Sequence, residues 1–269
     1  IKMEQPKNNL KIIADKKNAR VILPNMLTLI GVCIGLTSIR FALSGEFHLA
    51  IIAIIFAALF DGLDGRIARL IKATSKVGKE LDSLTDMISF GVAPAFIMYF
   101  WKLNTLGRFG WLLCLVYVIC VALRLARFNV NSSQEPSWKD NFFEGVPSPA
   151  GGILVLTPLI LSLTEFDYIQ LNYDIIVPIF FISTSFLLIS KFPSYSFKKI
   201  VIQRKTTIFL LFGIVLFFGL LLIYTFEVIA ISSIIYLLLL PISFLHYRKI
   251  KKSQENDGIQ YEDDLEDIL

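Results

Sequence analysis

Charged side chains are scarce in this sequence. Aspartate, glutamate, lysine and arginine make up 18% of the 269 residues, whereas 55% are hydrophobic and the mean hydropathy is +0.66. A soluble domain usually carries about 25% charged residues. The apolar residues form runs close to the length of about 20 residues that crosses a bilayer as a helix. The composition therefore excludes an ordinary soluble domain and predicts an all-α, polytopic membrane protein.

Cysteine is also rare. The three cysteines, Cys33, Cys114 and Cys120, all lie within apolar runs. Cys114 and Cys120 are separated by six positions, which is the spacing of neither a metal-binding pair nor a redox pair. We therefore expect no disulfide framework and interpret the cysteines as packing residues.

Eight apolar segments are predicted to span the membrane. They cover residues 24–43, 47–68, 81–101, 109–129, 148–164, 174–190, 207–225 and 228–246. Pro24 stands at the expected start of the first helix, a position at which proline is well tolerated. On the side of the N-terminus lie 23 of the 26 lysines and arginines, and such residues are enriched in cytoplasmic loops. We therefore expect a transmembrane helix bundle with both termini in the cytoplasm.

Polar tails flank the predicted bundle. Residues 1–23 are lysine-rich and lack the apolar core of a cleaved signal peptide. They are predicted to form a cytoplasmic basic arm, which either lies on anionic headgroups or acts only as a topology signal. Residues 248–269 begin basic and end acidic, and the acidic part is expected to be disordered. Between the tails, we expect a core over residues 24–190 and two additional transmembrane helices within 191–247.

Four aspartates are concentrated in the segment FDGLDGRIARLIKATSKVGKELDSLTDMISFG, residues 60–91. Asp61 and Asp64 are three positions apart, and Asp82 and Asp86 are four apart, so each pair shares one helix face. The short connection between the two spans makes them antiparallel neighbours. Clustered carboxylates at a membrane boundary require compensating charge, and oxygen ligands suit Mg²⁺, Mn²⁺ or Ca²⁺. We therefore predict that the four aspartates bind two divalent cations.

Residues beside the aspartates favour a phosphate ligand. Gly65 leaves room for a diphosphate, and Arg69 can hold a phosphate through a bidentate fork. Gly78 permits a tight chain path before the third span. Each of these residues alone has an ordinary explanation in packing or topology, and their joint spacing is what favours chemistry. Two metal ions commonly stabilise a phosphoryl group during displacement.

The same segment resembles the signature of the CDP-alcohol phosphotransferases. The pattern D-x-x-D-G-x-x-A-R-x8-G-x3-D-x3-D is matched without departure by Asp61, Asp64, Gly65, Ala68, Arg69, Gly78, Asp82 and Asp86. The resemblance implies that the four aspartates surround two metal ions, Mg²⁺ or Mn²⁺, and that Asp86 deprotonates the acceptor alcohol.

The resemblance also implies a binding site for the CDP-linked donor. Gly65, Gly78 and Arg69 are the candidate contacts within the signature. Residues 24–28, PNMLT, resemble the start of the first span in the family, so Asn25 and Thr28 are candidates for contacting the nucleotide. The family resemblance further implies a homodimer with contacts in the third and fourth spans.

Two later segments bear on the acceptor. Residues 122–129, ALRLARFN, and 142–152, FFEGVPSPAGG, resemble stretches of bacterial membrane-embedded phosphatidylserine synthases. This resemblance implies CDP-diacylglycerol as donor, L-serine as acceptor, and a site on the cytoplasmic side of a bacterial cytoplasmic membrane. Arg124 and Arg127 are candidate ligands for the serine carboxylate or a lipid phosphate.

Alternatives remain open at this point. Glycerol 3-phosphate or an inositol derivative would use the same aspartates with a different acceptor. A divalent-cation carrier would use them to line an ion path, although such sites tend to lie near the bilayer midplane. No nucleic-acid partner is expected.

Overall fold

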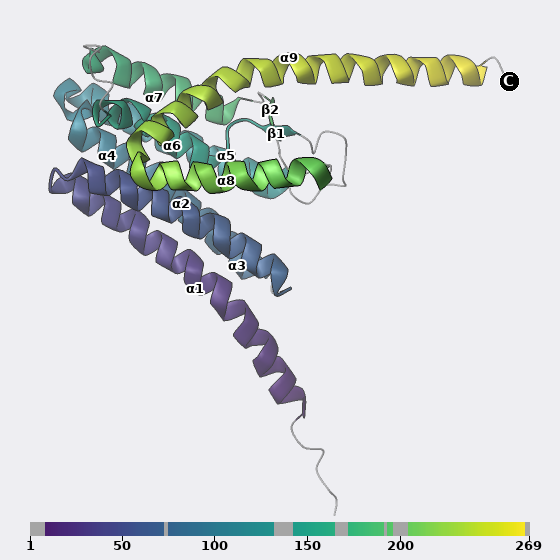
Figure 1. The fold of residues 1–269 in the computed structure, drawn as a ribbon, viewed down its shortest axis with the longest axis horizontal. Coiled ribbons are helices and arrows are strands. Elements are labelled where there is room, and N and C mark those ends of the chain that lie inside the picture. The colour runs from purple at the N-terminus through teal and green to yellow at the C-terminus, as the bar shows by residue number, and fades with distance from the viewer. Residues whose placement is uncertain are drawn as a thin grey trace, which may run out of the picture. The chain divides into compact units, whose positions relative to one another are not determined.

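The computed structural model describes residues 9–72, 75–131, 142–164, 172–190, 193–195 and 204–266. They belong to two compact units, residues 1–125 and 126–269, and nearly all of them are helical (Figure 1). Among the described residues, five helices are long and apolar enough to cross a membrane: Ile22–Leu43, Phe47–Leu70, Val77–Trp101, Arg108–Val130 and Thr225–Arg248. Three apolar helices are shorter: Ser148–Ser162, Tyr173–Ile189 and Ile208–Ile223. The predicted polytopic helical fold is confirmed, and each of the eight predicted spans occurs as helix.

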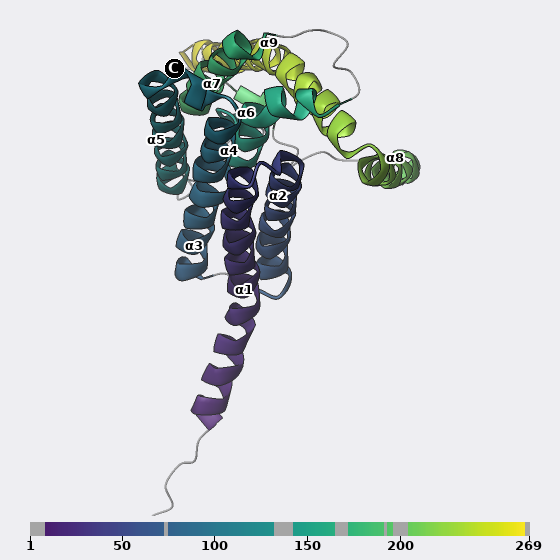
Figure 2. The ribbon, with the colours of Figure 1, turned by 90° about the vertical axis from the view of Figure 1, so that its left-hand side faces the viewer.

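The first unit is built around a pair of long helices, α1 (Asn9–Leu43) and α2 (Phe47–Leu70). They are joined by a tight turn in which Gly45 has a φ of +78°, a conformation that glycine adopts without strain. The two helices pack along each other, as Figure 2 shows. Small residues of α2, including Ala50, Ala53 and Ala57, are buried and allow a close approach. This pairing brings α1 beside the aspartates of α2.

α1 begins well before the proline that was expected to open it. Within the described residues the helix starts at Asn9, and Pro24 lies inside it. The prediction of a start at Pro24 is therefore wrong. Lysine, alanine and leucine in the preceding residues are good helix formers, and they extend the helix in spite of the N–H that proline lacks.

The third predicted span is interrupted. α3 (Lys76–Asp86) is followed by a six-residue π-helical turn, η1 (Met87–Val92), and then by α4 (Ala93–Trp101). The N–H of Ala93 donates to the carbonyl of Ile88, five residues earlier. This irregularity was not predicted, and π-turns of this kind are frequent at functional sites. The unit is completed by the 3₁₀ turn η2 (Leu103–Leu106) and most of α5 (Arg108–Asn131).

The second unit contains the later helices and a small sheet. Its elements are β1 (Phe142–Glu144), α6 (Ser148–Ser162), α7 (Tyr173–Ile189), β2 (Pro193–Tyr195), α8 (Arg204–Ile223) and α9 (Thr225–Glu266). The two strands pair antiparallel with Phe143 opposite Ser194, and they were missed in the all-α prediction. A tightly packed start of α6 was expected, and a Cβ at Gly151 would lie 2.8 Å from Cδ2 of Leu188.

The C-terminal part of the chain differs from its predicted form. α9 continues as helix to Glu266, far beyond the expected end of the span at residue 246. The expectation of a disordered acidic tail is therefore wrong over this range, because glutamate, glutamine and lysine favour helix. In α8, the described side chains from Ile208 to Leu220 are exposed and largely apolar, which suits contact with lipid.

Candidate active site

The aspartates predicted from the sequence lie together in the first unit. Asp61 and Asp64 come from α2 and Asp82 from α3, and one carboxylate oxygen of each lies within 4.8 Å of the others. Asp86 follows one turn after Asp82, and its carboxyl group lies close to that of Asp61. Asp64 is the most buried, with 3% of its surface exposed. Helix spacing and the packing of neighbouring helices thus combine to form one acidic cluster.

This acidic cluster fits a divalent cation. The donor atoms are all carboxylate oxygens, the hard ligands that Mg²⁺ and Mn²⁺ prefer. Oδ1 of Asp64 and Oδ1 of Asp86 are buried, and neither has a hydrogen-bond partner in the described part of the chain. Buried polar atoms rarely stay without a partner in native proteins. Cations bound in the acidic cluster would satisfy these oxygens.

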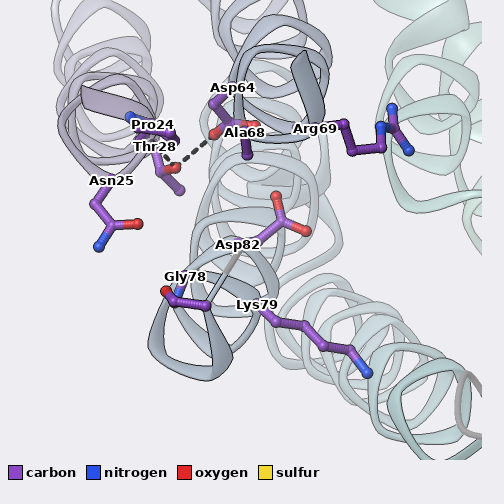
Figure 3. Close-up of a pocket in the computed structure, with 11 residues that line it drawn as sticks. Pro24, Asn25, Thr28, Asp64, Ala68, Arg69, Gly78, Lys79 and Asp82 are labelled. Atoms are coloured by element: carbon purple, nitrogen blue, oxygen red, sulfur yellow. Dashed lines mark hydrogen bonds between the residues drawn. The ribbon is translucent and has the colours of Figure 1, made fainter. Parts of the chain in front are cut away.

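Thr28 contacts Asp64 from the neighbouring helix α1. Its Oγ1 lies 2.6 Å from Oδ2 of Asp64 and 3.0 Å from the carbonyl of Pro24, and Figure 3 shows the bond to Asp64. The hydroxyl carries one hydrogen, and the shorter distance favours donation to the carboxylate. Donors of this type orient metal-binding carboxylates. The side chain assigned to the nucleotide from the sequence is thus placed against a candidate metal ligand.

Replacing Thr28 by valine is expected to weaken Mn²⁺ binding about 10- to 100-fold, the usual effect of removing such an orienting partner. Valine keeps the shape of the side chain and removes only the hydroxyl. Electron paramagnetic resonance during Mn²⁺ titration measures the affinity. Thr37→Val is the matched control, because Thr37 is exposed on the same helix and, within the described part of the chain, its hydroxyl donates to the carbonyl of Cys33. Equal affinities for the two variants would contradict the assigned role of Thr28.

A pocket of about 540 Å³ opens beside the acidic cluster, between α1, α2 and the start of α3. All five residues predicted to contact the donor line it: Asn25, Thr28, Gly65, Arg69 and Gly78. Asp64 and Asp82 reach its wall, so the pocket and the acidic cluster are continuous (Figure 3).

The two pocket glycines leave space for different reasons. A Cβ at Gly65 would meet no described atom within 4 Å, so a side chain there would project into the open pocket. A Cβ at Gly78 would lie 3.0 Å from both Oδ1 of Asn25 and Oγ of Ser75. Gly78 therefore permits the close approach of α1 to the beginning of α3. Ser75 caps that helix by accepting a hydrogen bond of 2.9 Å from the N–H of Gly78.

Ser75 and Lys79 line the pocket and were not predicted as site residues. Both could have been found from local spacing. Ser75 stands where a helix N-cap is expected, and Lys79 precedes Asp82 by three positions on the same helix face. Arg69 is exposed, and in Figure 3 its guanidinium points away from the hydrogen bond between Thr28 and Asp64.

The two candidate acceptor residues on α5 have different surroundings. Arg124 is partly buried and lies close enough to Asp86 for an electrostatic interaction. Arg127 belongs to the second unit, where its Nη1 donates to the carbonyl of Ile189 at 2.7 Å. That carbonyl lies at the end of α7, where the last carbonyls have no helical donor. Arg124 is thus brought to the acidic cluster, and the described contact of Arg127 is with a helix end.

Known proteins share the part of the sequence that forms this site. Residues 21–183 match the model of the CDP-alcohol phosphatidyltransferase family. The CDP-diacylglycerol–serine O-phosphatidyltransferase of Mycobacterium leprae is 45% identical over 174 residues, which cover 64% of this chain and 57% of that protein. A protein of the same name from Helicobacter pylori is 35% identical, over 75% of this chain and 83% of that protein. One from Bacillus subtilis is 36% identical, over 66% of this chain and 92% of that protein.

The chain spans little more than half the length of the mycobacterial relatives it matches, 57% for Mycobacterium leprae and 50% for Mycobacterium tuberculosis. The match to the family covers the acidic cluster and every residue that lines the pocket. Together with its long apolar helices, this match identifies an integral membrane protein. The chain belongs to the CDP-alcohol phosphatidyltransferase family.

Proposed function

We propose that this protein transfers the phosphatidyl group of CDP-diacylglycerol to L-serine, giving phosphatidylserine and CMP. The observation that carries this proposal is the convergence of four carboxylates from α2 and α3 beside an open pocket. The three relatives described above, each named as a CDP-diacylglycerol–serine O-phosphatidyltransferase, support the choice of donor and acceptor.

In this proposal the pocket binds the CDP part of the donor, and the acyl chains stay in the bilayer. The open surface at Gly65 accommodates the diphosphate, and Arg69 swings in to bind a phosphate oxygen. Asn25 and Gly78 also line the pocket, and they contact the nucleotide. The four aspartates would hold two divalent cations, Mg²⁺ or Mn²⁺, which would stabilise the negative charge of the diphosphate and of CMP.

The acceptor is activated at Asp86. Its carboxylate takes the proton of the serine hydroxyl, and the serine oxygen forms a bond to the phosphatidyl phosphorus. The bond from that phosphorus to the CMP oxygen breaks, and CMP leaves. Arg124, next to Asp86, binds the serine carboxylate. Arg127 remains a second candidate acceptor ligand through the nitrogens that Ile189 does not use.

The site is proposed to face the cytoplasm of a bacterial cell. The aspartates lie in the halves of α2 and of the span Val77–Trp101 that the distribution of basic residues assigns to the inside. Serine then reaches them from water, and the lipid substrate enters from the bilayer. We further propose a homodimer formed through the third and fourth spans. The exposed apolar side chains of α5, such as Leu112, Val116 and Ile119, support a face that meets lipid or a second copy.

CMP release by the purified protein tests the function directly. CDP-diacylglycerol is offered with serine, glycerol 3-phosphate or inositol, each with and without Mg²⁺ or Mn²⁺. The proposal requires cation-dependent release with serine. Release with glycerol 3-phosphate but not with serine would identify glycerol 3-phosphate as the acceptor. Cation flux across liposomes without CMP release would favour a carrier.

Replacing Gly65 by alanine is expected to raise the KM for CDP-diacylglycerol about tenfold, corresponding to about 1.4 kcal/mol of lost binding. The added methyl group narrows the pocket without a clash against any described residue. Gly62→Ala is the matched control, because a Cβ there also meets no described atom within 4 Å and Gly62 is exposed on the same helix. Both variants gain about 1 kcal/mol of helix propensity, so a rise in KM shared by both would contradict the role of Gly65.

A further inference from the structure

The π-helical turn η1 follows Asp86 directly and packs between two helices. On one side is α1, where a Cβ at Gly35 would lie 2.5 Å from Oγ of Ser89. Ser89 also approaches the carbonyl of Gly31 at 3.4 Å. On the other side is α5, where a Cβ at Gly91 would lie 3.2 Å from Val121. The turn is therefore held by close contacts on both sides.

A hydrogen bond joins the turn to α5. The hydroxyl of Tyr117 donates to the carbonyl of Phe90 at 2.7 Å, and both residues are fully buried. In a regular α-helix this carbonyl would accept from the N–H four residues later. That residue is Pro94, which has no N–H. The tyrosine hydroxyl thus supplies a donor that the α-helical pattern cannot supply here.

The position of the turn connects this hydrogen bond to the acidic cluster. Asp86 is the last residue of α3 and the residue that caps η1. Its carboxyl group lies close to that of Asp61, so the path of the turn sets where this carboxyl group stands in the acidic cluster. The backbone of the turn, in contrast, lies outside the pocket that takes the donor.

We propose that Tyr117 is a positioning residue, which fixes the π-helical turn through the carbonyl of Phe90 and thereby holds Asp86 in its place in the acidic cluster. The inference rests on the proposed function for its kinetic consequence. Tyr117 acts in this proposal through the backbone of η1, and it is not among the described residues that line the pocket.

The test is Tyr117→Phe, which removes one oxygen and keeps the ring. We expect kcat for CMP release with serine to fall roughly 10- to 100-fold, as for other small displacements of a reacting group. The KM for CDP-diacylglycerol should stay within about twofold, because uniform binding is not affected. Incorporation of p-aminophenylalanine at position 117 restores a donor and should recover most of kcat.

Cys114→Ala is the matched control. Cys114 lies one turn before Tyr117 on α5, is buried, and contacts the carbonyl of Ala95 in α4 through its Sγ at 3.5 Å. Loss of the Cys114 thiol perturbs packing between α4 and α5, but the carbonyl of Phe90 keeps its donor, the hydroxyl of Tyr117. An unchanged kcat in Tyr117→Phe, or an equal fall in Cys114→Ala, would overturn the proposal.

Hydrogen exchange measured by mass spectrometry supplies a readout that is independent of activity. Tyr117→Phe should accelerate exchange in peptides covering residues 87–95 and leave peptides from α1 and α2 unchanged. Faster exchange throughout the first unit would show general destabilisation and would overturn the positioning role. If wild-type protein releases no CMP with any acceptor, the proposed function fails, and the exchange comparison still decides whether Tyr117 fixes the turn.

Discussion

Asp86→Asn is expected to lower kcat for CMP release about 10²- to 10⁴-fold, the range attributed to a positioned general base. Asparagine has nearly the same shape as aspartate but cannot accept the proton of the serine hydroxyl. The measurement is CMP release at saturating serine and CDP-diacylglycerol, with a parallel Mn²⁺ titration. The three carboxylates of Asp61, Asp64 and Asp82 remain within 4.8 Å of one another, so most of the Mn²⁺ affinity should survive.

The control for Asp86→Asn is Glu80→Gln. Glu80 is an exposed carboxylate on the same helix, and it does not line the pocket. The same change from carboxylate to amide should leave kcat unaltered there. Near-normal CMP release by Asp86→Asn would remove Asp86 from the role of base.

Asp64→Asn should have the largest effect on metal binding. We expect the Mn²⁺ dissociation constant to rise by about 100-fold or more, because loss of a ligand exceeds the 10- to 100-fold effect of losing a ligand's hydrogen-bond partner. Raising the Mn²⁺ concentration should restore part of the activity of Asp64→Asn, whereas no concentration should restore that of Asp86→Asn. This difference separates a residue that only binds metal from one that also acts as the base.

Asp64→Asn is expected to weaken metal binding but to stabilise the metal-free protein. In metal-free protein, Asp64→Asn should raise the melting temperature, since it removes one buried negative charge from a group of like charges. The Oδ1 of asparagine can still accept the hydrogen bond of Thr28. With Mn²⁺ present, wild type should be the more stable protein, because ligand binding stabilises the folded state. A lower melting temperature for the variant in both conditions would contradict this account of the cluster.

Much of the acidic cluster could be predicted from the sequence because its geometry is local. Helix periodicity places Asp61 beside Asp64 and Asp82 beside Asp86, and the short connection between the spans brings the two pairs together. The assignment of the donor residues came from family resemblance. Those five residues line one pocket, and their individual roles remain predictions.

The features that the sequence did not predict depend on long-range contacts. The bond from Tyr117 to Phe90 joins residues 27 positions apart, and the bond from Arg127 to Ile189 joins residues 62 apart. Periodicity within a segment carries no information on such pairs. The role of Pro94 in the π-turn was likewise hidden, because a proline in a membrane helix has several possible consequences.

The π-turn divides the third span into two halves, and it rotates the side chains of one half about the helix axis relative to those of the other. Each residue of an α-helix advances the side chains by roughly 100° around the axis, so the extra residue held in η1 offsets α4 from α3 by about that angle. The acidic half can therefore face α2 while the apolar half, with Ala93 and Ile97 buried, keeps its own orientation in the core. Loss of a single residue from Met87–Val92 would bring the two halves into phase and turn the aspartates away from their partners on α2. The acidic cluster therefore depends on the number of residues in this six-residue segment as well as on the aspartates themselves.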